Sequence, residues 1–267
     1  MTPFAFHRPA SQASALQLHQ AGDDARYLAG GQSLLPAMKL GLAAPSDLID
    51  LALLPAANAI AVQGGTLRIG AMTPHAAVAA SAEVRQQLPA LAALADGIGD
   101  PAVRSRGTIG GSLAQNDPAA CYPAALLGLG ATVHTDRRQI AADDFFKGLY
   151  ETALEPGELI TAVSFPIPKR AAYVKFKQPA SRFALVGVFV SQGPQGVRVA
   201  VTGAGPCAFR VAAFEAALAK AWSAQSLDGL AVPADGLNTD LHASAAYRAH
   251  LIGVLARRAV AAACRRA

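Results

Sequence analysis

The sequence predicts an α+β protein made of two parts that differ in their residue pattern. In the first part short apolar strands alternate with alanine-rich helices, and in the second a meander of about three antiparallel strands precedes two helices. Between them, segment 165–170 contains two prolines, which remove backbone donors and favour an extended chain. We therefore expect two domains, residues 1–168 and residues 169–267, which 267 residues can accommodate.

In the first part, four short apolar runs bounded by Pro, Asn or Gly predict strands. They cover residues 47–51, 67–71, 131–135 and 159–165. Helix starts are expected at Thr73-Pro74 and at Ser81, because a hydroxyl caps free amides and proline suits a first turn. Alanine-rich helices should then continue to about Ala95.

The second part has strand spacing first and helical spacing afterwards. Residues 173–177 alternate and residues 184–191 form an apolar run, and a Gly-Pro-Gln-Gly turn at 193–196 leads into a strand over 197–201. Helical spacing of apolar residues covers 209–222 and 244–258.

Composition and charge exclude several classes of protein. Apolar residues make up 52%, charged residues only 15%, and mean hydropathy is +0.30, which excludes a disordered chain. The net charge of +5 is mild, and the basic pairs at 257–258 and 265–266 have few aromatic neighbours, so we expect no binding of nucleic acid. The uncharged stretch 118–135 is interrupted by proline and glycine, so we expect no membrane span.

Cysteine and histidine usage indicates a reduced setting without a metal site. Cys121, Cys207 and Cys264 are too far apart to form a disulfide framework or a four-thiolate site. The histidines show no metal-ligand spacing, and the acidic residues between 143 and 158 are expected to form a solvated loop. Since residues 1–9 also show no signal-peptide pattern, we expect a cytoplasmic protein that binds no metal.

Two glycine pairs are the strongest candidates for a ligand site. Residues 29–34 read Ala-Gly-Gly-Gln-Ser-Leu and precede an expected helix over 35–42, capped by Ser33. Residues 106–113 read Arg-Gly-Thr-Ile-Gly-Gly-Ser-Leu and are followed by Asp117, a candidate cap for a helix that begins at Pro118. Because paired glycines leave amides unshielded, the two loops suit a diphosphate held from both sides by neutral groups. We expect Gly110 to lie against a phosphate oxygen.

Two other glycine motifs leave alternatives open. The segment 203–208 matches a dinucleotide fingerprint, follows a strand and has Asp228 about 20 residues further on, so a nicotinamide-dependent dehydrogenase is one alternative. The antiparallel pattern before it and the poor strand over 227–232 favour a simple strand-to-helix turn. Residues 110–114 approximate a nucleophile elbow but lack its last glycine.

Five segments of the chain form a recognisable set: AGGQSLLPAMKL at 29–40, GTIGGSLAQNDPAA at 107–120, FFKGLYETALEPGELI at 145–160, KFKQPASRFALVGVFV at 175–190 and VRVAVTGAGP at 197–206. Together they resemble the flavoprotein (medium) subunits of molybdenum hydroxylases, the carbon-monoxide dehydrogenase and xanthine dehydrogenase family. The resemblance implies an FAD-binding domain of the PCMH type with two α/β subdomains. A small domain with a three-stranded antiparallel sheet and helices would follow it.

The resemblance also implies which residues bind FAD. Leu159 and Ile160 match positions that pack near the isoalloxazine, and Lys177 matches a lysine near the flavin, with Lys175 as a close competitor. Phe183 is expected either to stack on the ring or to fill core. The full set expected to contact the cofactor is Ala29, Gly30, Gly31, Gln32, Ser33, Leu34, Thr108, Gly110, Gly111, Ser112, Asp117, Leu159, Ile160 and Lys177.

The chain departs from the family pattern at two positions. Gln32 stands where a histidine is frequent, and Cys121 stands where an acidic residue is frequent, so we expect a buried structural thiol there. Some relatives carry an additional iron–sulfur cluster in this subunit, and three dispersed cysteines predict none here.

The implied function is electron transfer in a heterotrimeric complex. Non-covalently bound FAD would receive electrons from two-iron two-sulfur centres on a small subunit and pass them to an external acceptor such as a quinone, NAD or oxygen. A large molybdopterin-binding subunit would oxidise the substrate, so no side chain of this chain is expected to be catalytic. A non-redox assembly subunit is the remaining alternative.

Overall fold

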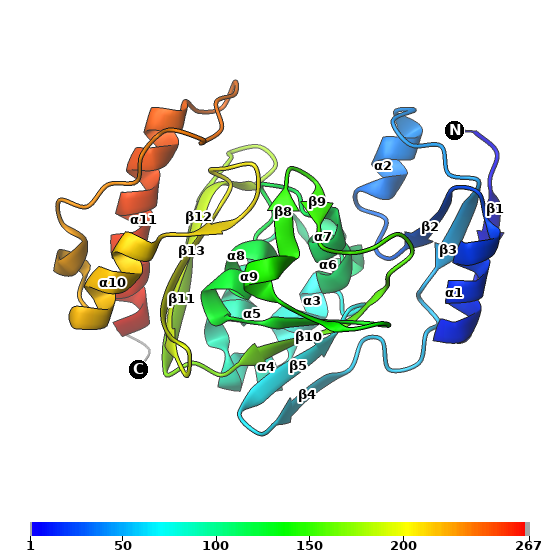
Figure 1. The fold of residues 1–267 in the computed structure, drawn as a ribbon, viewed down its shortest axis with the longest axis horizontal. Helices are drawn as coiled ribbons and strands as arrows, with labels where there is room; N and C mark the ends of the chain where they lie inside the picture. The colour runs from blue at the N-terminus through cyan, green and yellow to red at the C-terminus, as the bar shows by residue number, and fades with distance from the viewer. Residues whose placement is uncertain (1, 265–267) are drawn as a thin grey trace.

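The computed structural model describes residues 2–264, which form three lobes in a row (Figure 1). The N-terminal lobe, drawn in blue, lies at one end, and the C-terminal helices, drawn in orange and red, lie at the other. A central lobe built around a five-stranded sheet separates them. The predicted α+β class is confirmed.

The N-terminal lobe is a small parallel sheet covered by one helix. Strand β3 lies in the middle and pairs in parallel with β1 and with β2, which is the geometry expected when helical segments connect the strands. Ser11 caps the helix through a hydrogen bond from the Ser14 amide. The elements are β1 (Ala5–His7), α1 (Gln12–Ala21), β2 (Ala25–Leu28), α2 (Leu34–Lys39) and β3 (Asp47–Asp50).

The central lobe packs short helices against a five-stranded antiparallel sheet of order β4-β5-β10-β6-β7. Its strands are β4 (Ile60–Gln63), β5 (Thr66–Gly70), β6 (Thr132–Thr135), β7 (Gln139–Ala141) and β10 (Ile160–Pro166), with a separate hairpin of β8 (Phe146–Gly148) and β9 (Glu151–Thr152). Its helices are α3 (His75–Ala80), α4 (Ala82–Gln87), α5 (Pro89–Asp96), α6 (Pro101–Arg106), α7 (Ile109–Gln115), α8 (Tyr122–Leu129) and α9 (Ala142–Phe145).

The C-terminal lobe is an antiparallel sheet with two helices on its outer face (Figure 1). The three predicted strands are β11 (Arg170–Lys177), β12 (Ala184–Gly193) and β13 (Gly196–Thr202), and the two-residue β14 (Phe209–Arg210) adds a short fourth. The helical elements are α10 (Ala212–Lys220), a 3-10 turn (Ala224–Leu227) and α11 (Ala245–Cys264). The helix predicted from residue 209 starts at Ala212 because β14 uses residues 209 and 210.

Helix α8 joins the central and C-terminal lobes. All eight of its residues are buried, and β12 and β13 pack on it while α11 covers the other face of that sheet. Side chains of the sheet bind the last carbonyls of α8: Ser191 Oγ donates to Gly128 at 2.5 Å and Arg198 Nε to Leu127 at 2.6 Å. Because both faces of β12 are covered, its sequence is a continuous apolar run instead of an alternating one.

Two predicted helix starts differ in detail. Asp117 does not begin a helix, because residues 117–120 form a turn in which its Oδ1 accepts from the Ala119 amide, and α8 begins at Tyr122. Ser33 occupies the cap position of α2, but its side chain makes no capping hydrogen bond. Among residues 2–264 no helix combines the length and apolar character that a membrane span needs. The basic pair at 265–266 lies outside the described residues.

Candidate functional site

A cavity of about 700 Å³ lies where the three lobes meet, within the size range of small-molecule sites. Both glycine loops line it, as do residues from the central sheet and from the β11–β12 turn. The structure thus brings together all the predicted site residues except Lys177: Ala29, Gly30, Gly31, Gln32, Ser33, Leu34, Thr108, Gly110, Gly111, Ser112, Asp117, Leu159 and Ile160.

The first glycine loop presents free backbone amides to this cavity. Within residues 2–264, none of the amides of residues 29–34 donates a hydrogen bond, although the segment follows a paired strand directly. Gly31 has a φ of +72°, which only glycine adopts without strain. Gly30 lies against the backbone of Arg106 and Gly107, so the two loops touch and no β-carbon fits between them. Unpaired amides at a loop of this kind suit an anion.

The second loop contributes hydroxyls instead of amides. Thr108 Oγ1 caps α7 by accepting from the Gly111 amide at 3.1 Å, and the Gly110 amide donates to the carbonyl of Ala71 at 2.8 Å. A β-carbon on Gly110 would lie 2.6 Å from that of Ala71. Gly110 lines the cavity, but its amide is already bonded to Ala71 and so is not free for a phosphate oxygen. The lack of a side chain at this position allows α7 to pack on the chain after β5. The hydroxyl of Ser112 makes no hydrogen bond with the rest of the described chain.

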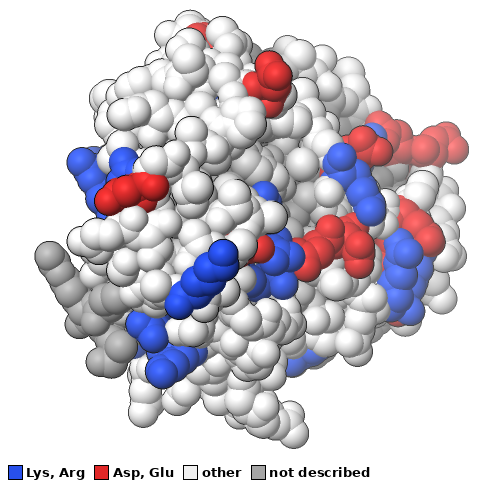
Figure 2. All heavy atoms as spheres, turned by 60° about the vertical axis from the view of Figure 1, so that its left-hand side comes forward, with Lys and Arg blue, Asp and Glu red and all other residues white. Residues whose placement is uncertain are grey.

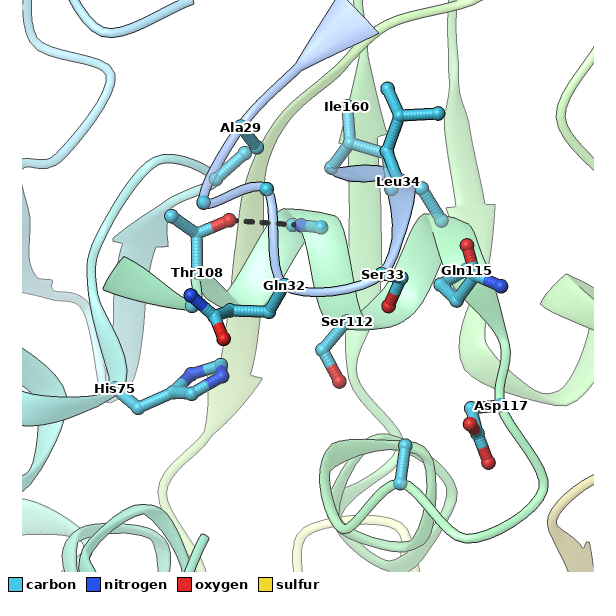
Figure 3. Close-up of a pocket in the computed structure, with 18 of the residues that line it drawn as sticks. Ala29, Gln32, Ser33, Leu34, His75, Thr108, Ser112, Gln115, Asp117 and Ile160 are labelled. Atoms are coloured by element: carbon cyan, nitrogen blue, oxygen red, sulfur yellow. Dashed lines mark hydrogen bonds between the residues drawn. The ribbon is translucent and has the colours of Figure 1, made fainter. Parts of the chain in front are cut away.

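His75 lies at the end of the cavity where the two loops meet. Figure 3 shows its imidazole at the same end as the amide of Gln32, below Thr108. The residue is only 5% exposed, and burial together with the nearby Arg104 guanidinium lowers the pKa of His75 to about 4. The imidazole is therefore neutral at physiological pH.

The wall formed by Leu159 and Ile160 is held by an ion pair behind it. Glu158 accepts from Arg138 Nε at 3.0 Å and Nη2 at 2.9 Å, and also from the Thr135 hydroxyl at 2.7 Å. The Arg138 guanidinium and these hydrogen bonds lower the pKa of Glu158 to about 2. A buried carboxylate with this many partners fixes the backbone that leads into β10.

The C-terminal lobe supplies a lysine, but not the one that the sequence favoured. Lys175 lines the cavity and donates from Nζ to the Arg182 carbonyl at 3.0 Å and to Cys121 Sγ at 3.3 Å. Lys177 is exposed and lies outside the lining, so the geometry favours Lys175, the competitor named from the sequence, as the lysine near the cofactor. Cys121 is buried, and Phe183 also lines the cavity.

Sequence reasoning missed several lining residues. The sequence marks His75 only as one of the histidines without metal-ligand spacing, and no motif points to Tyr27. The hydroxyl of Tyr27 donates to the Gly157 carbonyl at 3.1 Å, and burial raises the pKa of Tyr27 to about 12. Neither residue belongs to a glycine motif, so only the tertiary contact reveals it. The other missed residues include His19, Met72, Val103 and Gln115.

The apparent dinucleotide fingerprint at 203–208 is a structural turn. The strands before it are antiparallel, and the chain after it continues into β14 instead of a helix. The Gly203 amide donates to Pro118, and its carbonyl accepts from the buried Arg248 at 2.7 Å. The turn therefore lacks the parallel βαβ unit that a nicotinamide-binding fingerprint requires.

The fold and the cavity together define the class of protein. Free amides, neutral hydroxyls and a large partly apolar cavity suit a bulky cofactor with a phosphate group. The described residues contain no group of three or more His, Cys, Asp and Glu that could hold a metal ion. The chain belongs to the family described as the FAD binding domain in molybdopterin dehydrogenase, which matches residues 2–168.

Similar proteins extend this match to the whole chain. The carbon monoxide dehydrogenase medium chain of Hydrogenophaga pseudoflava is 36% identical over 97% of this chain and 96% of its own length. The nicotine 6-hydroxylase medium subunit of Paenarthrobacter nicotinovorans is 36% identical over 94% of both chains. A crystal structure of the Cu,Mo-CO dehydrogenase in its cyanide-inactivated form matches with a TM-score of 0.91 and 34% identity over both complete chains.

These matches confirm several predictions made from the sequence. The chain is an FAD-binding subunit of the molybdenum hydroxylase family, its cofactor is FAD, and it belongs to the oxidoreductase flavoproteins.

Proposed function

We propose that this chain is the electron-transfer subunit of a molybdenum-containing hydroxylase or dehydrogenase. It would take electrons from iron–sulfur centres of a small partner subunit and pass them to an external acceptor, while a large molybdopterin-binding subunit oxidises the substrate. When bound, FAD supplies the redox chemistry. The chain's own residues bind and orient the cofactor and adjust its electronics.

One observation carries the assignment of the binding site: the run of unpartnered amides over residues 29–34 that faces the cavity. Backbone amides left without partners in a partly buried loop cost free energy unless a ligand or water satisfies them. We infer that they hold the diphosphate, helped by the hydroxyls of Thr108 and Ser112. The remaining residues proposed to contact FAD are Gln32, Ser33, Leu34, Gly111, Asp117, Leu159 and Ile160.

The redox potential would be adjusted by Lys175. It is the lysine that lines the cavity, and Arg182 and Cys121 hold its ammonium group in place. A positive charge near the cofactor favours the reduced, anionic form. No side-chain acid or base is needed for the electron transfer itself.

The surface supports the proposal that the chain works in a complex. Figure 2 shows the side of the molecule with the C-terminal lobe, where charged residues leave large uncharged areas between them. Large apolar side chains are exposed on all three lobes, among them Leu42 at 77% and Leu241 at 90%. Contact with partner subunits would cover such surface, which is unfavourable in water. We propose a heterotrimer, single or doubled, located in the cytoplasm.

We retain residues 1–168 and 169–267 as the proposed domains. The chain leaves the central sheet after β10 and enters the C-terminal sheet at β11, so the change of sheet falls between Pro166 and Arg170.

Purification of the chain, alone and with its partners, tests the binding proposal. We expect a yellow protein with one FAD per chain, and full release of the dye on denaturation, since neither glycine loop contains a histidine to attach it. Flavin that stays on the unfolded chain would refute non-covalent binding. A colourless protein that FAD cannot reconstitute would refute the function and favour a non-redox assembly subunit.

Isolation of the native assembly tests the partner proposal. We expect iron, molybdenum and two further chains to co-purify at a constant ratio. A stable monomer by light scattering in cell extract, free of iron and molybdenum, would refute the complex.

A further inference from the structure

The two ring nitrogens of His75 have different surroundings. Nδ1 is sealed inside the protein and has no hydrogen-bond partner among the described residues. Nε2 lies next to Gly107, close to the contact between the two glycine loops. Unlike Nδ1, it is not a fully buried atom without a partner. Since His75 lines the cavity, Nε2 is the nitrogen that a ligand can reach.

These surroundings decide where a neutral imidazole carries its proton. A proton on Nδ1 would bury an N–H donor without an acceptor, which costs more than leaving a lone pair unpaired. A proton on Nε2 leaves that donor available to the cavity. The structure therefore favours the Nε2–H form. The centroid of the imidazole ring lies 5.3 Å from that of the Tyr122 ring.

Among the described residues, the Arg104 guanidinium near His75 is already bound and does not take the place of a ligand. It donates to the carbonyls of Ile98 at 3.1 Å and Gly99 at 3.3 Å. The groups that remain free are neutral donors: the loop amides, the side chain of Gln32 and the imidazole. Several neutral donors that converge on one place fit an anion with many acceptor oxygens.

We propose that His75 binds the diphosphate of the cofactor as a neutral hydrogen-bond donor through Nε2–H, between the two glycine loops. The inference rests on the proposed function and adds a ligand from outside both glycine motifs. Gly107 helps to position the imidazole, because a β-carbon at this residue would collide with Nε2 and displace the ring.

Binding to shortened cofactors tests this role. FAD and ADP both contain the diphosphate and riboflavin does not, so we measure the Kd of all three with the cofactor-free full chain. We expect His75→Phe, which keeps a ring but has no donor, to weaken FAD and ADP tenfold to a hundredfold, the usual effect of losing a hydrogen bond to a charged group. Riboflavin binding should not change. His75→Gln should restore part of the loss.

A matched control is His134→Gln, since His134 is bonded to Ser164 at 2.7 Å and lies outside the cavity lining. It should bind all three ligands as the wild type does. If His75→Phe changes the Kd of ADP by less than twofold, or weakens riboflavin as much as ADP, His75 only fills the wall and the proposal is wrong. If the wild type itself binds no FAD, the proposed function fails first.

Imidazole ¹⁵N spectra of the wild type provide a second measurement that does not depend on a variant folding. We expect the Nε2–H form in the free chain and a shift of the Nε2 signal when ADP is added. An Nδ1–H form, or no response to ADP, would overturn the proposal.

Discussion

His75 and Gly107 lie in direct contact: a β-carbon on residue 107 would come within 2.6 Å of Nε2 and 2.9 Å of Cδ2 of the imidazole. Gly107 has an ordinary extended conformation, with φ −60° and ψ 134°, so the backbone itself does not require glycine. The requirement comes from the neighbour, because the ring occupies the space of a side chain. Gly107 is therefore required by its contact with His75, which lies more than thirty positions earlier in the chain.

We expect Gly107→Ala to destabilise the protein by about 1–3 kcal/mol, the usual cost of overpacking a buried site. Part of this loss should disappear in the double variant Gly107→Ala with His75→Ala, because the ring is then absent. Urea unfolding of the four proteins gives the coupling free energy. Strictly additive effects would show that the contact does not matter for stability.

Gly110 and Gly111 are expected to respond differently to alanine. At 110 the β-carbon would lie 2.8 Å from the carbonyl oxygen of Ala71, and a backbone cannot easily move, so Gly110→Ala should lower the free energy of unfolding by about 3 kcal/mol. At 111 the nearest atom is a single side-chain oxygen, the Thr108 hydroxyl at 3.0 Å, and a small shift relieves this contact, so Gly111→Ala should fold normally and bind FAD more weakly. Thermal unfolding and flavin fluorescence separate the two effects.

Gly205→Val is the control for this pair. The nearest atoms to its β-carbon would be those of the Phe209 ring at 3.3 Å and the Cys207 carbonyl oxygen at 3.5 Å, and none of these residues lines the cavity. We expect an unchanged flavin spectrum. Loss of the cofactor in this variant, with retention in Gly111→Ala, would reverse the assignment of the glycine motifs.

We expect the free energy of unfolding to decrease as the pH is lowered, because His75 is buried in its neutral form. Its pKa is about 4 in the folded chain and about 6.5 in an unfolded one, so between these values the unfolded state binds more protons. The stabilisation is complete above pH 6.5 and is lost as pH falls toward 4, by about 2 kcal/mol between pH 7 and pH 5. Urea unfolding of the cofactor-free chain at both pH values should show a smaller difference in His75→Asn. Equal differences in the two proteins would contradict the prediction.

Lys175→Gln should lower the midpoint potential of bound FAD by on the order of 30 mV, equivalent to about 1.4 kcal/mol for a two-electron couple. The reason is the loss of a cation that favours the anionic reduced cofactor. Lys177→Gln is the matched control and should leave the potential unchanged, since Lys177 lies outside the lining. Spectroelectrochemical titration measures both. If the midpoint potential shifts in Lys177→Gln and not in Lys175→Gln, Lys177 is the lysine near the cofactor, as the sequence favoured.

The sequence predicted the parts of the site that depend on local pattern. Paired glycines before an expected helix identify both loops, and the apolar run over 184–191 identifies a strand of the C-terminal sheet. The reason for Gly110 could not be predicted, because Ala71 is distant in the chain and only the fold brings them together. His75 was missed for the same reason, since a single histidine has no spacing to recognise. Lys175 and Lys177 both lie on β11, and the register of its pairing with β12 shifts between Phe176 and Lys177. The two lysines therefore have different surroundings, which the sequence pattern does not show.

The burial of α8 affects how the protein can be divided. The proposed domain boundary lies after residue 168, yet the apolar core that contains α8 also contains Phe189 and Ala200 from the C-terminal sheet. If the chain were cut at the domain boundary, each of the two fragments would expose its part of this shared apolar core. The carbonyls at the end of α8 would also lose the hydrogen bonds that Ser191 and Arg198 donate. Calorimetry should therefore find these two lobes melting in a single transition, and a gene split at this point should yield fragments that fold only when produced together.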